Sequence, residues 1–272
     1  MPTKPRISLL NLKINPLEIE EVLGQISDAL DKKTPLRLVQ LNPEMTVAAQ
    51  KDKSVSQNIL KADLVLANGS GIQWAAEFLA SPNQSIGNWF VSLVEMMLFP
   101  RSVQNIIPEK FTSTSFTLKV LQIANRTNRK VLLVGKPKNA HIRHTEAYLT
   151  KKFPHAEFGH FDGSNFDQQK QIELEKQLKQ MKPDIVLLGL GFPAQEFAAQ
   201  ELKKSSSHGI FIGEGGTFDY ENFGGTIRRA PKLVQSFHLE WLWRLIVEPS
   251  RWRRQLAIPR FAWSVYRSTK KQ

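Results

Sequence analysis

Cysteine is absent from the 272-residue chain, and this absence excludes several kinds of chemistry at once. A disulfide scaffold, a cysteine-ligated zinc or iron–sulfur centre and a thiol nucleophile all need a side chain that the sequence does not contain. Because chains without disulfides are typical of reducing compartments, we expect a cytosolic location.

Long apolar runs are missing as well. No stretch reaches the ~20 apolar residues that span a bilayer, and the N-terminal Met-Pro-Thr-Lys-Pro-Arg is not followed by the apolar region of a signal peptide. The sequence therefore predicts neither a membrane span nor a standard export signal. The most apolar segment outside the expected sheet, residues 88–100, is interrupted by Glu95. Two interpretations of it stay open, a buried helix or a loop that dips into an interface.

Acidic residues are too few to balance the basic ones, since 25 Asp and Glu oppose 37 Lys and Arg and leave a net charge of +12. Residues 226–272 alone contain eleven basic and two acidic residues, together with four of the six tryptophans. Arginine interleaved with tryptophan faces nucleic acid or the headgroups of an anionic membrane, and an ordinary solvated helical face is the plainer alternative. Zinc-finger spacing, an aromatic-rich strand motif and a basic region before heptads are absent, so we expect no specific nucleic-acid partner.

Short apolar runs alternate with amphipathic segments along residues 1–225. Helices are expected at residues 17–30, 45–59, 72–78, 117–125, 140–153, 167–181 and 194–202. Strands are expected at residues 36–41, 62–71, 130–135, 183–191 and 209–216. This alternation predicts an α/β fold, a Rossmann-like, mostly parallel sheet with helices on both faces. We divide the chain into this domain, residues 1–225, and a basic, aromatic, helical C-terminal appendage, residues 226–272.

The loops that follow the expected strands are the natural ligand sites, because ligands of open parallel sheets bind beyond the carboxyl ends of the strands. These loops begin at Asn42, Asn68, Gly135, Gly191 and Gly213. Several contain glycine, and each leads to the N-terminus of a helix, where backbone N–H groups favour an anion. A nucleotide or diphosphate ligand fits this design. The GxGxxG and GxxxxGK[ST] patterns are absent, which disfavours NAD and P-loop chemistry.

Two segments contain motifs that composition alone would not produce. They are GLGFPAQE at residues 189–196 and the run at residues 213–254 that contains RAP, LEW and EP-x-R-x-x-R. Further matching segments are LNPE at 41–44, ADLVLANGSGIQWAAEFL at 62–79 and the stretch at 108–137. On these residues, over nearly its whole length, the chain resembles the WecG/TagA/CpsF family of bacterial glycosyltransferases. The resemblance implies transfer of a HexNAc-type sugar from a UDP-sugar to a polyprenyl-diphosphate-linked acceptor in cell-envelope polysaccharide synthesis of the teichoic acid type.

The resemblance also implies the site. The catalytic candidates are Asn68, Arg244, Arg251 and Arg254. The substrate-binding candidates are Gln40, Asn42, Gly69, Lys110, Gly135, Gln195, Glu196 and Arg229. An inverting transfer without metal or cofactor is implied, and the absence of any Asp-x-Asp agrees with it. The three C-terminal arginines, seven and then three residues apart, are expected near one face of a helix, where they would donate to a diphosphate.

Partners and location follow from the same resemblance. Besides the UDP-sugar and the lipid-linked acceptor, an anionic membrane surface is expected, with the protein peripheral on the cytoplasmic face of the membrane. A homo-oligomer is left open.

The chain departs from the family pattern at several positions, of which Asn68 matters most for the chemistry. Asn68 stands where the family carries an aspartate proposed as the base, and an amide cannot hold a proton. Three interpretations stay open: Asn68 orients the acceptor while Glu44, Glu196 or Glu214 is the base; the chain binds sugar nucleotide or lipid diphosphate without fast turnover; or Asn68 deamidates. Lys110, Ser113 and Ser115 replace the family's Arg, Gly and Asp, Gln40 replaces a Thr, and residues 80–107 are interpreted as an insertion.

Overall fold

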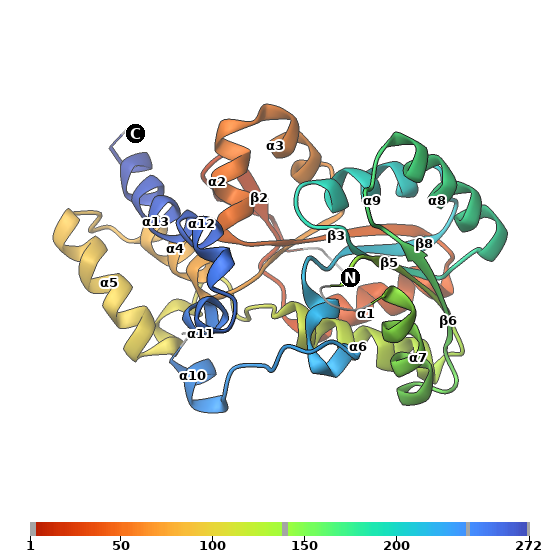
Figure 1. The fold of residues 1–272 in the computed structure, drawn as a ribbon. Helices are drawn as coiled ribbons and strands as arrows, with labels where there is room; N and C mark the ends of the chain where they lie inside the picture. The colour runs from red at the N-terminus through yellow and green to blue at the C-terminus, as the bar shows by residue number, and fades with distance from the viewer. Residues whose placement is uncertain (1–3, 138–140, 238–239, 271–272) are drawn as a thin grey trace.

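The computed structural model describes residues 4–137, 141–237 and 240–270. Its centre is a six-stranded sheet in the order β4-β3-β8-β7-β5-β6, in which every neighbouring pair is parallel (Figure 1). The strands are β3 (Pro35–Leu41), β4 (Leu64–Ala67), β5 (Lys130–Gly135), β6 (Glu157–Asp162), β7 (Ile185–Gly189) and β8 (Gly209–Gly213). The predicted α/β fold with a mostly parallel sheet is confirmed.

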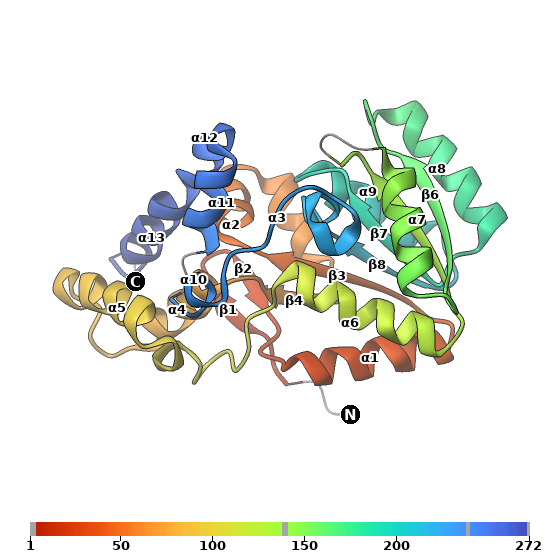
Figure 2. The same cartoon turned by 60° about the horizontal axis from the view of Figure 1, so that its bottom comes forward.

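Helices cover both faces of the sheet (Figures 1 and 2). One face packs against α1 (Ile19–Asp31), α6 (Ser113–Arg126) and α7 (Ile142–Lys152). The other face packs against α2 (Pro43–Lys51), α3 (Lys53–Leu60), α4 (Ser70–Ala80), α8 (Gln168–Met181) and α9 (Ala194–Lys204). Along β5, Val131 and Leu133 pack on the face covered by α1, α6 and α7, while Leu132 and Val134 pack on the opposite face. Burial on both faces explains why the strands are apolar runs rather than alternating patterns.

Three elements differ from the sequence expectations. The helix predicted at residues 45–59 is two helices, because Asp52 adopts an extended backbone and its carboxylate accepts from the N–H of Ser54 at 2.8 Å to begin α3. Strand β6 was left out of the strands of the expected sheet, since this edge strand is partly exposed and lacks an apolar run. A small antiparallel hairpin, β1 (Ile7–Leu9) and β2 (Leu12–Ile14), was not predicted either.

The C-terminal region is helical, as predicted, but it is not one helix. It contains α10 (Lys232–Ser236), α11 (Glu240–Val247), a 3-10 turn (Pro249–Arg251), α12 (Trp252–Gln255) and α13 (Ala257–Ser268). Placing Arg244, Arg251 and Arg254 on one helix face is therefore wrong. Pro249 disfavours helical backbone at Glu248, which has φ −128° and ψ 77°, and so ends α11. The domain boundary near residue 225 stays a prediction, although Phe261 and Val265 of α13 join the core beside α2 and α4.

Residues 80–107 contain α5 (Ile86–Leu98) followed by a 3-10 turn (Pro100–Val103). Neither interpretation of the apolar segment holds as stated, because α5 is a helix with no fully buried residue. Trp89 and Met96 pack toward the core, while Phe90 and Leu98 are 63% and 56% exposed. Within the described ranges, no helix has both the length and the apolar character to cross a membrane.

Candidate active site

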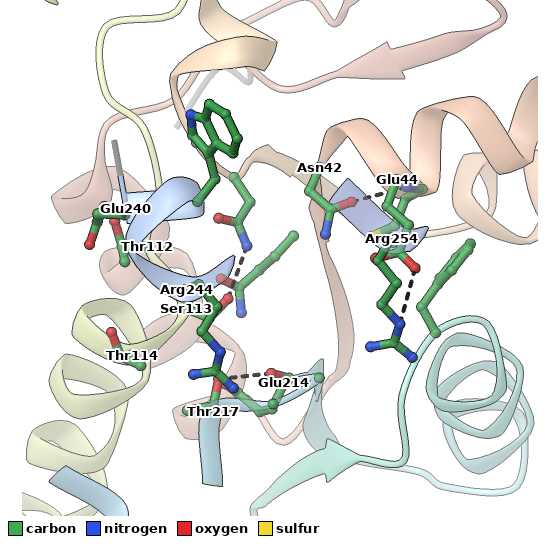
Figure 3. A pocket seen from close by; sticks show the side chains of 18 of the residues that line it. Asn42, Glu44, Thr112, Ser113, Thr114, Glu214, Thr217, Glu240, Arg244 and Arg254 are labelled. Atoms are coloured by element: carbon green, nitrogen blue, oxygen red, sulfur yellow. Dashed lines mark hydrogen bonds and ion pairs between the residues drawn. The ribbon is translucent and has the colours of Figure 1, made fainter. Parts of the chain in front are cut away.

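A cavity of about 680 Å³ lies beyond the carboxyl ends of β3, β4, β7 and β8, the edge at which the sequence places the ligand. This volume lies within the ~300–1,000 Å³ that is usual for small-molecule sites. Nine of the predicted site residues line it: Gln40, Asn42, Asn68, Gly69, Lys110, Gln195, Arg229, Arg244 and Arg254. Figure 3 shows several of these side chains with their neighbours. The sheet topology therefore brings together residues that are widely separated in the chain.

Gly135 and Glu196 do not line this cavity, which corrects their assignment as substrate contacts. A Cβ atom at Gly135 would lie 2.9 Å from the Phe218 ring, so the glycine permits close packing. Glu196 is buried and forms an ion pair with Arg37 at 3.1 Å. Burial raises the pKa of Glu196, and the Arg37 guanidinium opposes that rise. The side chain of Arg251 lies outside the part of the chain that the structure describes.

Two helix N-termini face the cavity. Asn42 caps α2, since its Oδ1 accepts from the N–H of Met45 at 3.0 Å. Gly69 precedes α4 with φ 92°, a left-handed conformation that glycine adopts without strain. Pro43 and Ser70, the first residues of the two helices, are part of the cavity wall. The partial positive charge at these helix ends suits an anionic ligand.

Three amide side chains in the cavity wall differ in their hydrogen bonding. Asn68 donates from Nδ2 to Ser113 Oγ at 2.9 Å, and Gln195 accepts from the N–H of Gly215 at 2.9 Å. Gln40 is 4% exposed, and neither its Oε1 nor its Nε2 has a hydrogen-bond partner among the described residues. Buried amides are nearly always hydrogen-bonded. The unsatisfied amide of Gln40 in the cavity wall is therefore a strong candidate for contact with a polar ligand.

Basic groups form another part of the wall. The Lys110 ammonium lies 3.2 Å from Ser70 Oγ, and burial lowers its pKa, an effect that Glu240 opposes and Arg229 reinforces. Arg229 donates to Ser115 Oγ at 2.7 Å and lies 3.5 Å from a Glu240 oxygen. These two cations come from segments far apart in the sequence and line the same cavity.

Arg244 and Arg254 occupy different environments. Arg244 is buried, with its guanidinium 3.3 Å from Asp219, paired with Glu248, and 4.4 Å from the centre of the Tyr220 ring. The Arg254 side chain is half exposed, with Nε 3.7 Å from Glu44, as the dashed line in Figure 3 marks. Arg244 is therefore held rigidly, whereas Arg254 keeps access to solvent.

Glu214 is a buried carboxylate in the cavity wall, directly after β8. Both of its carboxylate oxygens accept from the Thr117 hydroxyl, at 2.7 and 2.8 Å. Burial raises the pKa of Glu214 to about 7, although the hydroxyl groups of Thr117 and Thr217 partly oppose the rise. Near neutral pH this group can therefore gain or release a proton.

The comparison with known families decides the identity. The profile described as "Glycosyl transferase WecG/TagA/CpsF family" matches residues 7–97 and 93–272. The chain belongs to this family. It is therefore a glycosyltransferase that transfers a hexosyl group.

Curated relatives cover most of this glycosyltransferase. It is similar to proteins of Bacillus spizizenii, with 29% identity over 87% of this chain and 80% of the relative, and of Bacillus subtilis, with 26% identity over 89% and 83%. A Staphylococcus aureus protein is 24% identical over 87% of this chain and 82% of its own. All three are named N-acetylglucosaminyldiphosphoundecaprenol N-acetyl-beta-D-mannosaminyltransferase.

Asp219, Glu240 and Trp243 are among the lining residues of the glycosyltransferase cavity that the sequence prediction missed. All three fall in the specific run at residues 213–254, so the signal was present, but spacing alone did not place them. In the described ranges, no group of three or more His, Asp or Glu side chains is arranged to hold a metal ion.

Replacing Glu214 with Gln is expected to change how stability depends on pH. The folded pKa of about 7 exceeds the ordinary 4.5, so the folded state binds more protons between these values and loses stability as pH rises. Above pH 7 the buried charge costs the wild type about 3 kcal/mol. Urea unfolding at pH 8 should therefore show Glu214→Gln to be more stable than wild type, with the difference vanishing near pH 4.5. A difference that is constant with pH would contradict the burial argument.

Proposed function

We propose that this glycosyltransferase moves a HexNAc-type sugar from a UDP-sugar to a polyprenyl-diphosphate-linked sugar acceptor in cell-envelope polysaccharide synthesis of the teichoic acid type. The observation that carries the proposal is the cavity itself, where the N-termini of α2 and α4 and the side chains of Lys110, Arg229 and Arg244 surround one space. That arrangement suits a diphosphate. The names of the relatives support an N-acetylglucosaminyl-diphosphoundecaprenol acceptor and transfer of an N-acetylmannosaminyl group.

The proposed roles follow from the contacts. Lys110 and Arg229, with the two helix N-termini, bind the diphosphate of the donor. Gln40 supplies a free amide to a sugar hydroxyl, while Asn42, Gly69 and Gln195 shape the surface around it. Two further arginines, Arg244 and Arg254, stabilise the negative charge that develops on the leaving UDP or bind the lipid diphosphate. Because cations line the space in which the leaving group would lie, we propose a transfer that needs neither metal nor cofactor. An inverting outcome stays a prediction from the family resemblance.

Asn68 favours a second candidate, a protein that binds a sugar nucleotide or lipid diphosphate without fast turnover. Its amide donates to Ser113 and cannot hold a proton. This candidate predicts binding of UDP to the wild type without product, and turnover only after Asn68→Asp.

The deciding experiment incubates the full chain with UDP-N-acetylmannosamine or UDP-N-acetylglucosamine and a polyprenyl-diphosphate-linked N-acetylglucosamine in vesicles. Formation of a lipid-linked disaccharide and release of UDP by wild type are expected. Intact-mass and peptide analysis should find Asn68 as the amide in the active sample, which separates direct activity from activity gained by deamidation. Binding without product in wild type, together with turnover in Asn68→Asp, would establish the second candidate instead.

One end of the molecule carries many exposed apolar side chains, which we name the apolar end surface. It consists of Ile86, Phe90, Val91, Val94, Met97, Leu98, Leu233, Phe237, Trp241, Leu242, Ile246 and Val247. They belong to α5, α10 and α11 or lie beside them, and these helices lie at one end in both views (Figures 1 and 2). Neighbouring α12 and α13 carry the exposed Arg253, Arg254 and Arg260. Apolar side chains flanked by cations suit the surface of an anionic bilayer.

The cavity opens close to this surface, since Met96 of α5 and Trp241 of α11 both line it. A bilayer against the apolar end surface would therefore bring a lipid-linked diphosphate to the cavity. We propose a peripheral position on the inner face of the cell membrane. A homo-oligomer stays a prediction, as does the absence of a specific nucleic-acid partner.

The double substitution Phe90→Ser and Leu98→Ser is expected to weaken binding to anionic vesicles by about tenfold or more, since each side chain contributes ~1.5–3 kcal/mol when fully buried. Both side chains are largely exposed, so folding should be preserved. Co-sedimentation with vesicles containing phosphatidylglycerol measures the effect. The matched control is Leu60→Ser with Ile172→Ser, two exposed apolar residues of α3 and α8 outside the apolar end surface. Equal binding by the two double variants would rule out the proposed contact.

A further inference from the structure

Transfer of a sugar to a hydroxyl group requires a group that accepts the hydroxyl proton, and the cavity contains several carboxylates. We propose that Glu214 is the general base of this glycosyltransferase, taking the proton from the acceptor hydroxyl while Asn68 orients that hydroxyl. The inference rests on the proposed function and assigns the step that Asn68 itself cannot perform, because an amide has no site that titrates in the working range.

The other carboxylates in the cavity wall are paired with cations. Glu44 lies 3.7 Å from Arg254, Asp219 lies 3.3 Å from Arg244, and Glu240 lies 3.5 Å from Arg229. Each of these three carboxylates is therefore already engaged by a guanidinium group.

Glu196, the remaining candidate from the sequence, forms an ion pair with Arg37 and does not line the cavity. Glu214 differs from all of these, since it forms no ion pair with any residue that the structure describes and its carboxylate oxygens accept from a hydroxyl group instead.

Glu214 and Asn68 both contact side chains of α6. Thr117 Oγ1 contacts both carboxylate oxygens of Glu214 and also lies 2.7 Å from the carbonyl oxygen of Ser113. The Ser113 hydroxyl in turn accepts from Asn68 Nδ2 at 2.9 Å. Ser113 and Thr117 occupy the first turns of α6, so one helix holds both the amide and the carboxylate. Asn68 and Glu214 both line the cavity and are both held by the N-terminal part of α6.

The step balances without any further reactant. The acceptor oxygen forms a bond to the anomeric carbon of the donor sugar, and the bond from that carbon to the UDP oxygen breaks with its electron pair leaving on UDP. The acceptor proton moves to the Glu214 carboxylate, which afterwards releases it to solvent. Because burial raises the pKa of Glu214 to about 7, its carboxylate is more basic than an ordinary one, and the rate should rise with pH through that value.

The experiment compares pH–rate profiles of the full chain with UDP-N-acetylmannosamine and the lipid-linked N-acetylglucosamine. Glu214→Gln is expected to lower kcat by about 10²–10⁴-fold and to abolish the rise near pH 7, while the affinity for UDP is retained. Thr117→Val removes a hydroxyl group that lowers the pKa of Glu214, so its profile should shift to higher pH. Glu44→Gln should keep the rise near pH 7, and Glu201→Gln on the far surface of α9 is the matched control for the chemical change.

Each failure has its own signature. Retention of both kcat and the pH rise in Glu214→Gln would overturn the assignment of the base and leave the proposed function intact. Absence of product from wild type with every donor would instead overturn the proposed function. If Glu214→Gln fails to fold, the Thr117→Val profile decides, and an unshifted profile would count against Glu214.

Discussion

Glu196→Leu is expected to destabilise the fold by about 3–5 kcal/mol, the usual effect of breaking a buried ion pair from one side. The Arg37 side chain is 1% exposed and the Glu196 side chain 2%, and their charged atoms are 3.1 Å apart. Arg37 also donates to the Asn58 carbonyl oxygen at 3.0 Å, but no other described carboxylate pairs with it. Loss of Glu196 would therefore leave a permanent cation buried between β3 and α9. Thermal unfolding should shift downward by on the order of 10 °C.

The double variant Arg37→Met with Glu196→Leu separates the charge effect from packing. Because it removes both charges, it should be clearly more stable than Glu196→Leu alone. A single variant within about 1 kcal/mol of wild type would show that Arg37 reaches solvent or another partner, contrary to the burial described here. Urea unfolding of both variants and wild type provides the comparison.

Arg244→Ala is expected to lower kcat by about 10²–10³-fold, the usual loss when a donor to developing charge is removed. Its guanidinium is fixed by Asp219, Glu248 and the Tyr220 ring, so it is positioned before substrate binds. Arg244→Lys should recover only part of the rate, because lysine keeps the charge but loses the planar fork that grips a diphosphate.

The control for Arg244 is Arg253→Ala. Arg253 is exposed, lies over the Trp252 ring at 5.5 Å and is absent from the cavity wall, so its removal should leave kcat within a few-fold of wild type. Thermal unfolding must accompany the kinetics, because Arg244→Ala also leaves two buried carboxylates without their cation. Equal rates for the two variants would show that Arg244 has a structural role and not a catalytic one.

Much of the fold could be predicted because the local patterns are strong. The runs at residues 130–135 and 209–213 are apolar on both faces, which only a central parallel strand requires, and both are strands. Edge strand β6 was left out of the expected sheet, since an edge strand has one less neighbour and tolerates polar residues. The break at Asp52 also escaped, because the apolar pattern continues across it and only the capping geometry reveals two helices.

The candidate site was predictable to the level of residue type and edge of the sheet. Gln195 and Glu196 are adjacent in sequence, yet successive residues of a helix point about 100° apart. One therefore lines the cavity while the other turns to Arg37. Motif matching treats such neighbours alike, and only the orientation of α9 separates them.

Composition, strand periodicity and motifs by themselves determined the α/β class, the family and the edge of the sheet at which the cavity lies, because each depends on local sequence. Which cavity carboxylate has no cationic partner among the described residues was decided only by the tertiary structure. Arg37 meets Glu196 across 159 residues and Thr117 meets Glu214 across 97. The proton affinity of a buried group depends on such distant neighbours and on its exclusion from water, and both are properties of the packed fold rather than of the local sequence.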